Sequence, residues 1–201
     1  MRAPAVAAAL RAGAPVADAA FDALFPAAHA ARAATHATPI AVAQQVCALL
    51  ASAPDDAVLD VGAGTGKMCL VGALTGPARW TGVEKHAGMV RIATRMARAL
   101  GVPDRAAFVH AHAAQLDWRP FAGVYFYNPL AEAVFAERDP GRAELAHHAD
   151  VTALEAALAT LRMGARVVTY FGFGGEVPAG FELVEARPIC GDALCLWVKS
   201  A

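Results

Sequence analysis

Short apolar runs recur along the chain and alternate with longer segments whose apolar residues are spaced as on one helix face. Short runs are typical of buried strands, and a spacing of three or four residues is typical of amphipathic helices. The alternation therefore predicts an α/β fold, a doubly wound and mostly parallel sheet with helices on both faces. The predicted strands comprise residues 57–59, 79–83, 107–110, 123–127, 166–171, 181–186 and 194–199.

Helices are predicted between these strands and before the first of them. Gly13 and Pro15 divide the Ala-rich beginning of the chain into two segments. Thr38-Pro39 predicts the start of the next helix, because a threonine can cap a helix and proline suits its first position. The predicted helices comprise residues 4–12, 15–25, 38 to before Pro54, 68–74, 87–100 and 150–162, the last capped by Asp150.

The last two predicted strands are separated by a turn near Gly191-Asp192 and should form an antiparallel hairpin. A chain of 201 residues is long enough for one full core. We expect residues 1–37 to form an N-terminal helical cap and residues 38–201 to form the main domain. The cap either only packs on the core or also covers a ligand pocket.

Composition narrows the classes of function. The formal net charge is −1 and no basic stripe is visible, so we expect no stable nucleic-acid partner. No apolar run of about 18 residues lacks a charge, and Arg11 and Asp18 interrupt the apolar beginning of the chain, so neither a membrane span nor a signal peptide is expected. The four cysteines show no C-x-x-C spacing, which favours reduced thiols and a cytoplasmic protein. The His147-His148 pair lacks the spacing of a metal motif, and no metal is expected.

The most informative segment is the glycine-rich loop after the first strand. Asp60 is followed by Gly62, Gly64 and Gly66 and then by a helix. A phosphate-binding loop would need a longer spacing and a hydroxyl after Lys67, and a dinucleotide fingerprint would need its third glycine one residue later. A tight strand–helix turn without a ligand is the remaining alternative.

The pattern D-x-G-x-G-x-G at Asp60, Gly62, Gly64 and Gly66 resembles the first motif of the class I S-adenosylmethionine-dependent methyltransferases. The resemblance covers about residues 38 to 199. It implies a seven-stranded sheet in the order 3-2-1-4-5-7-6 and S-adenosylmethionine as cofactor. The loop residues that it implies as cofactor contacts are Asp60, Gly62, Ala63, Gly64, Thr65 and Gly66.

Glu84 ends the second predicted strand and falls 22 residues after Gly62. A carboxylate at this place can accept hydrogen bonds from both ribose hydroxyls of an adenosine, and about 20 residues is the usual interval. Glu84 and the adjacent Lys85 are therefore expected at the cofactor. Nicotinamide enzymes use an acid here as well, and a solvated glutamate at a strand end is the structural alternative.

His112 and Ala113 follow the third predicted strand, where the resembled family often has G-D-A with the acid near the adenine. The resemblance makes both residues cofactor contacts, although His112 stands in place of that acid. A neutral histidine could still accept a hydrogen bond. A structural role for His112 is the alternative.

Asn128-Pro129 follows the fourth predicted strand. Many amine methyltransferases of the family have N-P-P-[YF] there, and their polar side chain orients the target nitrogen. Leu130 and Ala131 depart from that pattern. The resemblance makes Asn128 a cofactor and catalytic contact, whereas Asn-Pro is also a common turn. Tyr127 and His36 are the candidates for a proton acceptor.

The segments DVGAGTGK and GVEK also resemble the cofactor motifs of the Dot1-type lysine methyltransferases, which favours an amine acceptor. The predicted function is methyl transfer to a small-molecule or protein side-chain acceptor (EC 2.1.1.-). Two alternatives stay open, a non-catalytic S-adenosylmethionine-binding sensor or partner subunit and an NAD-dependent oxidoreductase. Oligomeric state and acceptor are not determined by the sequence.

Overall fold

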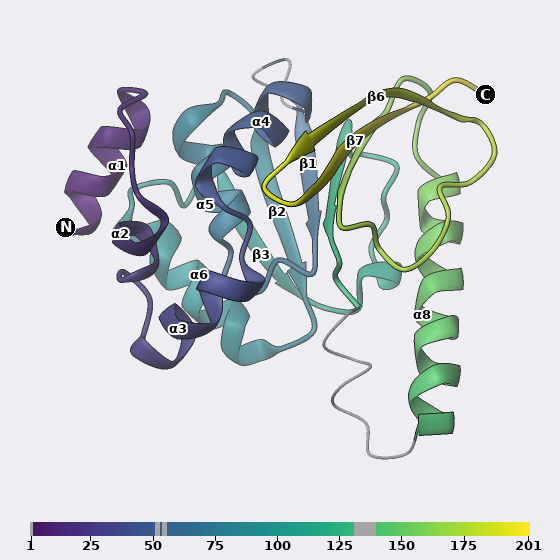
Figure 1. Cartoon of the computed structure of the whole chain (residues 1–201), viewed down its shortest axis with the longest axis horizontal. Coiled ribbons are helices and arrows are strands. Elements are labelled where there is room, and N and C mark those ends of the chain that lie inside the picture. Colours follow the sequence, from purple (N-terminus) through teal and green to yellow (C-terminus); the bar gives the residue numbers. More distant parts are fainter. Residues whose placement is uncertain (1, 51–52, 54–55, 131–139) are drawn as a thin grey trace.

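The structure is a computed structural model that describes residues 2–50, 53, 56–130 and 140–201. Helices lie on both faces of one sheet, as Figure 1 shows. The helices are α1 (Ala3–Arg11), α2 (Asp18–Asp22), α3 (Ala27–His36), α4 (Ile40–Leu50), α5 (Lys67–Thr75), α6 (Ala87–Ala99), the 3-10 helix η1 (Ala113–Gln115) and α8 (Pro140–Ala159). The strands are β1 (Ala57–Val61), β2 (Arg79–Glu84), β3 (Ala106–His110), β4 (Gly123–Tyr127), β5 (Arg166–Tyr170), β6 (Phe181–Ile189) and β7 (Asp192–Lys199).

The sheet has the order β3-β2-β1-β4-β5-β7-β6, which confirms the predicted topology. Strands β1 to β5 pair in parallel, and β7 pairs antiparallel with both β5 and β6. The hairpin of β6 and β7 is therefore at one edge of the sheet. Because neighbouring strands β2, β1, β4 and β5 are parallel, their carboxyl ends meet at the same edge, where ligands bind in open α/β sheets.

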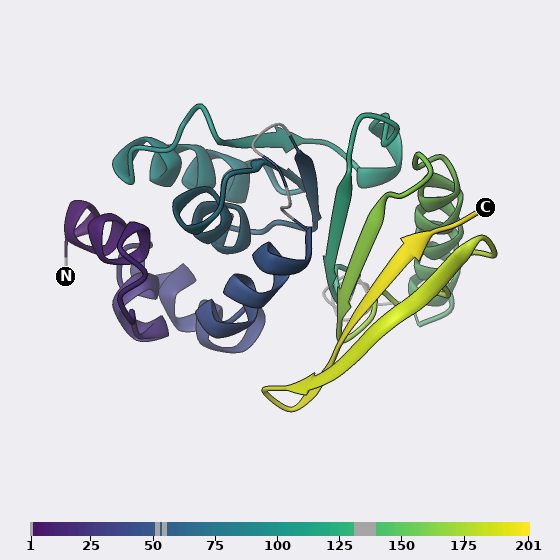
Figure 2. The same cartoon turned by 90° about the horizontal axis from the view of Figure 1, so that it is seen from above.

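Side chains alternate between the two faces of the sheet and form two cores. Val58 and Tyr125 belong to the cluster that includes residues of α1, α4, α5 and α6. Leu59 and Phe126 belong to the cluster that includes residues of α8. Figure 2 shows α1 to α6 on one side of the strands and α8 on the other.

The beginning of the chain differs from the prediction. Two helices were expected there, over 4–12 and 15–25, but the structure has α1, a shorter α2 and the separate helix α3. Pro26 is responsible, since its carbonyl accepts the first hydrogen bonds of α3, from His29 and Ala30. A proline at a helix start is favourable, whereas it interrupts a continuing helix.

The prediction that Thr38 caps α4 is wrong. Its hydroxyl is buried and lies 3.1 Å from the Tyr125 hydroxyl. The backbone N–H of Ile40 donates instead to Asp18 Oδ1, over 2.9 Å. A carboxylate from α2 therefore takes the capping role, which a local sequence pattern does not reveal.

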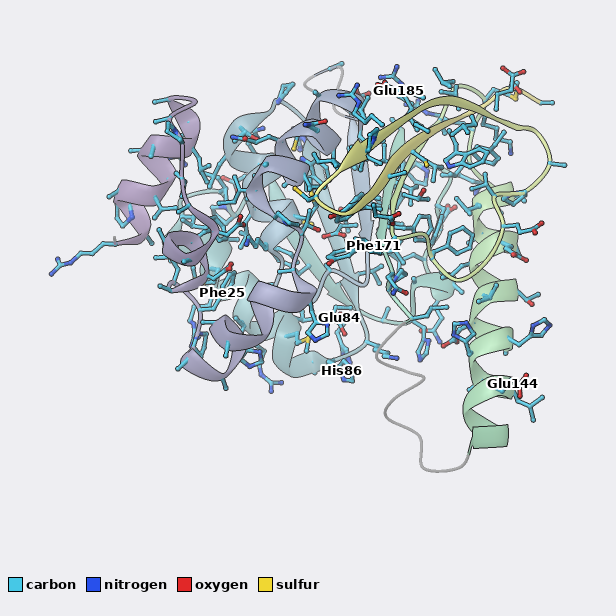
Figure 3. The ribbon with its side chains drawn as sticks, viewed as in Figure 1. Phe25, Glu84, His86, Glu144, Phe171 and Glu185 are labelled. Carbon is cyan, nitrogen blue, oxygen red and sulfur yellow. The ribbon has the colours of Figure 1, made fainter. Side chains whose placement is uncertain are left out.

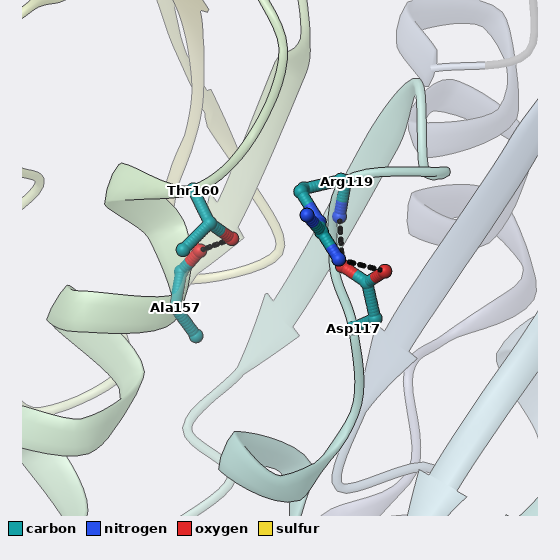
Figure 4. Close-up of polar contacts among 4 residues, drawn as sticks. All are labelled: Asp117, Arg119, Ala157 and Thr160. Carbon is teal, nitrogen blue, oxygen red and sulfur yellow. Dashed lines mark hydrogen bonds and ion pairs between the residues drawn. The ribbon is translucent and has the colours of Figure 1, made fainter.

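The helix predicted over 150–162 is longer and begins earlier. It is α8, which begins at Pro140, so Asp150 lies within the helix and is not its cap. After the last turn of α8, the Thr160 hydroxyl donates to the Ala157 carbonyl over 2.7 Å (Figure 4). In the segment before β4, the exposed side chains of Asp117 and Arg119 form an ion pair, which Figure 4 also shows. The guanidinium of Arg119 lowers the pKa of Asp117.

Within the described residues, the structure contains no helix that is both long and apolar enough to span a bilayer.

Candidate active site

A pocket of about 460 Å³ lies at the carboxyl edge of the parallel strands. Its walls come from α3, from the loops after β1, β2, β3, β4 and β5, and from α8. Figure 3 shows Glu84, His86 and Phe171 in this region, between α3 and α8. The pocket brings together these predicted site residues: His36, Gly62, Gly64, Thr65, Glu84, Lys85, His112, Ala113, Tyr127 and Asn128.

The glycines of the loop after β1 have three different surroundings, although all three have positive φ. A Cβ on Gly62 would lie 2.7 Å from the Pro129 Cβ, and one on Gly66 would lie 2.5 Å from Phe108 Cε1. A Cβ on Gly64 would meet no atom within 4 Å. Gly62 and Gly66 are therefore required for packing, while Gly64 exposes its backbone to the pocket. Gly66 does not line the pocket.

Two backbone hydrogen bonds hold the Glu84 side chain in the pocket. It is only 7% exposed. Its Oε2 accepts from the Gly64 N–H over 3.0 Å, and its Oε1 accepts from the His86 N–H over 2.8 Å. A carboxylate offers about four acceptor positions. Each oxygen therefore keeps capacity for one further donor, as a pair of ribose hydroxyls would require.

Residues from the loops after β2 and β3 line one wall of the pocket. Lys85 lies there, and its carbonyl accepts from His110 Nε2 over 3.0 Å. His112 and Ala113 lie at the start of η1, with the His112 N–H donating to Gln115 Oε1 over 3.3 Å. The Trp118 indole N–H donates to the Ala113 carbonyl over 2.9 Å. These bonds fix the backbone of the wall, and the His112 side chain forms a capping box with Gln115 at the start of η1.

The loops after β4 and β5 form the opposite part of the pocket. Asn128 has φ 39° and donates its N–H to the Gly172 carbonyl over 2.9 Å, which joins the two loops. Tyr127 lines the pocket and its ring contacts Phe171, with 5.9 Å between centroids. Burial raises the pKa of the Tyr127 hydroxyl. That hydroxyl is therefore protonated at neutral pH and suited to donate a hydrogen bond.

Asp60 points away from this pocket, under the glycine loop. It is 4% exposed and its Oδ2 accepts from the Cys69 thiol over 3.4 Å. Burial raises its pKa to about 7, with the charge of Glu84 adding to the rise. Neither Asp60 nor Ala63 lines the pocket, and of the two only Asp60 is buried. The strand periodicity accounts for this, because Asp60 shares a face with Val58.

The N-terminal helices are joined to the loop by a buried ion pair that the sequence did not predict. Lys67 begins α5, is 3% exposed, and lies 2.7 Å from Asp18 Oδ1 and 2.7 Å from Asp22 Oδ1. Its ammonium also lies 5.9 Å from the centre of the Phe21 ring. Both carboxylates belong to α2, so the lysine after the glycine pattern holds the N-terminal segment and does not face the pocket.

Helix α3 contributes the predicted His36 and also His29. Sequence reasoning missed several pocket residues as site residues, notably His86, Met89, Asp150 and Phe171. Phe171 was predicted as the last residue of a strand, and its position just after the carboxyl end of β5 was the available signal. Asp150 gave no such signal, because only the packing of α8 brings it to the pocket. In the described part of the chain, no group of three or more His, Cys, Asp or Glu side chains could hold a metal ion.

Part of the sequence is similar to a known protein family. Residues 58–148 match the family model described as methyltransferase domain. No curated protein matches the sequence. The match includes β1 except its first residue, β2 to β4 and every predicted cofactor contact.

Two solved structures share the fold. A crystal structure of an RNA methyltransferase from Salinibacter ruber, in complex with S-adenosyl-L-homocysteine, aligns with a TM-score of 0.63 at 20% identity, over 81% of this chain and 93% of that one. TrmN from Thermus thermophilus aligns with a TM-score of 0.63 at 23% identity, over 83% of this chain and 51% of TrmN. This chain therefore spans about half the length of TrmN. The strand order and these alignments show that the chain has the class I S-adenosylmethionine-dependent methyltransferase fold.

Proposed function

We propose that the protein binds S-adenosylmethionine in this pocket and transfers its methyl group to an acceptor (EC 2.1.1.-). The observation that carries the proposal is Glu84, whose two oxygens are fixed by backbone donors and still face a pocket beside the open Gly64 backbone. That arrangement suits the two hydroxyls of a ribose. The S-adenosyl-L-homocysteine in the Salinibacter ruber structure supports the choice of cofactor.

The residues of the pocket fit the parts of such a cofactor. Glu84 would receive the ribose, and the wall formed by Lys85, His112 and Ala113 would contact the adenine. Asn128, at the carboxyl end of β4, would orient the acceptor through its side-chain oxygen. The buried Asp60 would stabilise the loop from behind, through its hydrogen bond with the Cys69 thiol at the start of α5.

S-adenosylmethionine supplies an activated methyl group, because its sulfur carries a positive charge. The protein's own part is to align the acceptor with that methyl group and to exclude water. Alignment of this kind contributes about 7 kcal/mol or more in well-oriented systems. Tyr127 would donate a hydrogen bond near the acceptor, and His36 or His29 would take a proton where the acceptor has one to lose.

The first experiment is calorimetric titration of wild type with S-adenosylmethionine, S-adenosylhomocysteine and NAD. The same titrations are made with Glu84→Ala and Glu84→Gln, and with Glu182→Ala as the matched control, since Glu182 is an exposed glutamate on β6. We expect Kd for the first two ligands to rise about tenfold or more in Glu84→Ala, because hydrogen bonds to a charged group contribute about 1.5–3 kcal/mol. The Kd of Glu84→Gln should lie between those of wild type and Glu84→Ala, since the amide nitrogen of glutamine cannot accept a hydrogen bond.

NAD binding alone, or equal Kd values in the Glu84 and Glu182 variants, would refute this assignment of the pocket. A non-catalytic S-adenosylmethionine-binding role makes a different prediction. It requires tight binding together with no formation of S-adenosylhomocysteine for any acceptor, whereas the proposed enzyme releases it at a rate that Asn128→Ala lowers.

A further inference from the structure

Helix α3 forms one wall of the pocket but is held in place through its neighbours in the chain. It brings His29 and His36 to the pocket. Among residues 27–31 and 36, whose side chains the structure describes, none has a side-chain hydrogen bond or ion pair, and none belongs to either apolar core. The position of the two histidines therefore depends on the segments that flank α3, which are α2 and the start of α4.

Lys67 is bonded to both of these segments. Its ammonium lies 2.7 Å from Asp22 Oδ1, at the last residue of α2. It lies 2.7 Å from Asp18 Oδ1 as well, and the same oxygen accepts from the Ile40 N–H over 2.9 Å, at the first residue of α4. One buried ammonium therefore sets both the point from which the chain enters α3 and the point to which it returns.

The location of Lys67 connects this anchor with the glycine loop. Lys67 is the first residue of α5 and directly follows Gly66, in the same turn that places Gly64 at the pocket. The Lys67 and Asp22 side chains are only 3% and 7% exposed. Apolar packing is not directional, whereas an ion pair shielded from water acts strongly between two defined atoms. The arrangement therefore suits the task of setting the distance between α3 and the loop.

We propose that Lys67 is a positioning residue of the pocket: through Asp18 and Asp22 it holds α3 against the glycine loop, so that His29 and His36 face a ligand bound there. This inference rests on the proposed function. Its consequence is a coupling, because a ligand that contacts both the loop and α3 favours the arrangement in which the ion pairs are intact. Ligand binding should therefore protect α3, and loss of the ion pairs should remove that protection.

The test compares wild type with the double variant Lys67→Met/Asp22→Asn, which removes the ammonium without leaving the buried Asp22 carboxylate unpaired. Arg119→Met is the matched control, because it breaks an exposed ion pair in the segment before β4. Hydrogen exchange of residues 27–36 is measured with and without S-adenosylhomocysteine. Residues 57–61, which form β1, are the internal reference for the stability of the whole fold.

A second readout reports on the two histidines directly. The imidazole NMR signals of His29 and His36, assigned from His29→Gln and His36→Gln, are followed as S-adenosylhomocysteine is added to wild type, to the double variant and to Arg119→Met. A merely structural role for Lys67 would speed exchange of residues 57–61 as well and would leave the response of the imidazole signals to the ligand intact.

We expect exchange of residues 27–36 to be about tenfold faster in the unliganded double variant than in wild type, with residues 57–61 unchanged, because only a local opening becomes easier. In wild type, S-adenosylhomocysteine should slow this exchange and shift both imidazole signals. In the double variant the ligand should still bind and do neither. Arg119→Met should behave as wild type.

Unchanged exchange of residues 27–36 in the double variant, or imidazole signals that respond there as in wild type, would overturn the inference. Should the double variant not fold, wild type decides alone: equal slowing of residues 18–22 and 27–36 by bound S-adenosylhomocysteine supports the coupling, and no slowing of residues 27–36 overturns it. Failure of S-adenosylhomocysteine to bind wild type would refute the proposed function, while exchange in the unliganded variant would still decide the role of Lys67.

Discussion

The loops after β1 and β2 differ in kind from the loops after β4 and β5, although all four contribute to one pocket. In the first pair, positive φ falls on Gly62, Gly64 and Gly66, and the polar atoms of Glu84 have backbone partners. In the second pair, positive φ falls also on Asn128 and Phe171, and an aromatic ring is left exposed. The backbone of the loops after β1 and β2 is therefore relaxed, whereas the backbone of the loops after β4 and β5 is strained.

This difference in backbone strain agrees with a difference in what the two pairs of loops bind. A loop that receives a constant ligand can be built without strain, since glycine adopts the required backbone freely. Side chains that must reach into a pocket from a tight strand end carry the strain themselves. The side of the pocket formed by the glycine loop therefore suits a common cofactor, and the side formed by the loops after β4 and β5 suits a particular acceptor.

The largest expected effect concerns packing in the glycine loop after β1. Gly66→Ala should destabilise the fold by about 2–5 kcal/mol, because its Cβ would overlap the Phe108 ring and its φ is 85°. Gly64→Ala is the matched control and should lose only about 1–2 kcal/mol, since its Cβ meets no neighbour. Urea denaturation measures both. Equal losses would show that the two glycines do not differ in packing.

The next effect is a pH dependence from Asp60. Burial holds its folded pKa at about 7, above the 3.8 of a free aspartate, so between these pH values the folded state keeps a proton that the unfolded state has released. Stability from this group is therefore lost as pH rises through that window. We expect about 3 kcal/mol of loss between pH 5 and pH 8, and a flatter profile in Asp60→Asn.

Asp117→Asn is the control for Asp60, because Asp117 is exposed and its pKa is lowered rather than raised. The free energy of unfolding is measured in urea at several pH values. An Asp60→Asn profile as steep as that of wild type would mean that the buried carboxyl does not titrate in this range.

The smallest expected effect on stability concerns Phe171, in the strained loop after β5. Phe171→Gly should change the free energy of unfolding by no more than about 1 kcal/mol, since relief of the left-handed strain offsets the lost ring contacts. Phe173→Ala, in the same loop, should lose about 3–5 kcal/mol because that ring is buried. Thermal and urea unfolding measure both variants. A large loss in the free energy of unfolding of Phe171→Gly would show that the ring contributes to stability and not to binding.

The N-terminal helices and α8 show where local patterns failed. Phe21 and Phe25 are spaced four residues apart, as on one helix face, and both are buried. The sequence did not predict α3, nor that Asp18 would cap α4 and pair with Lys67 across 49 positions of the chain. Likewise Asp150 was expected to cap a helix, and its place at the pocket depends on how α8 packs against the sheet.

The sequence by itself determined the succession of the strands along the chain, the glycine loop, and the acid at the end of β2. These follow from hydrophobic periodicity and from short spacings, which are local properties of a chain. Only the tertiary structure decided that Asp60 lies behind the pocket, that Lys67 holds α2, and that Phe171 faces the pocket in a strained backbone. Each of these depends on contacts between segments far apart in sequence, and such contacts exist only when the sheet and its two layers of helices have formed.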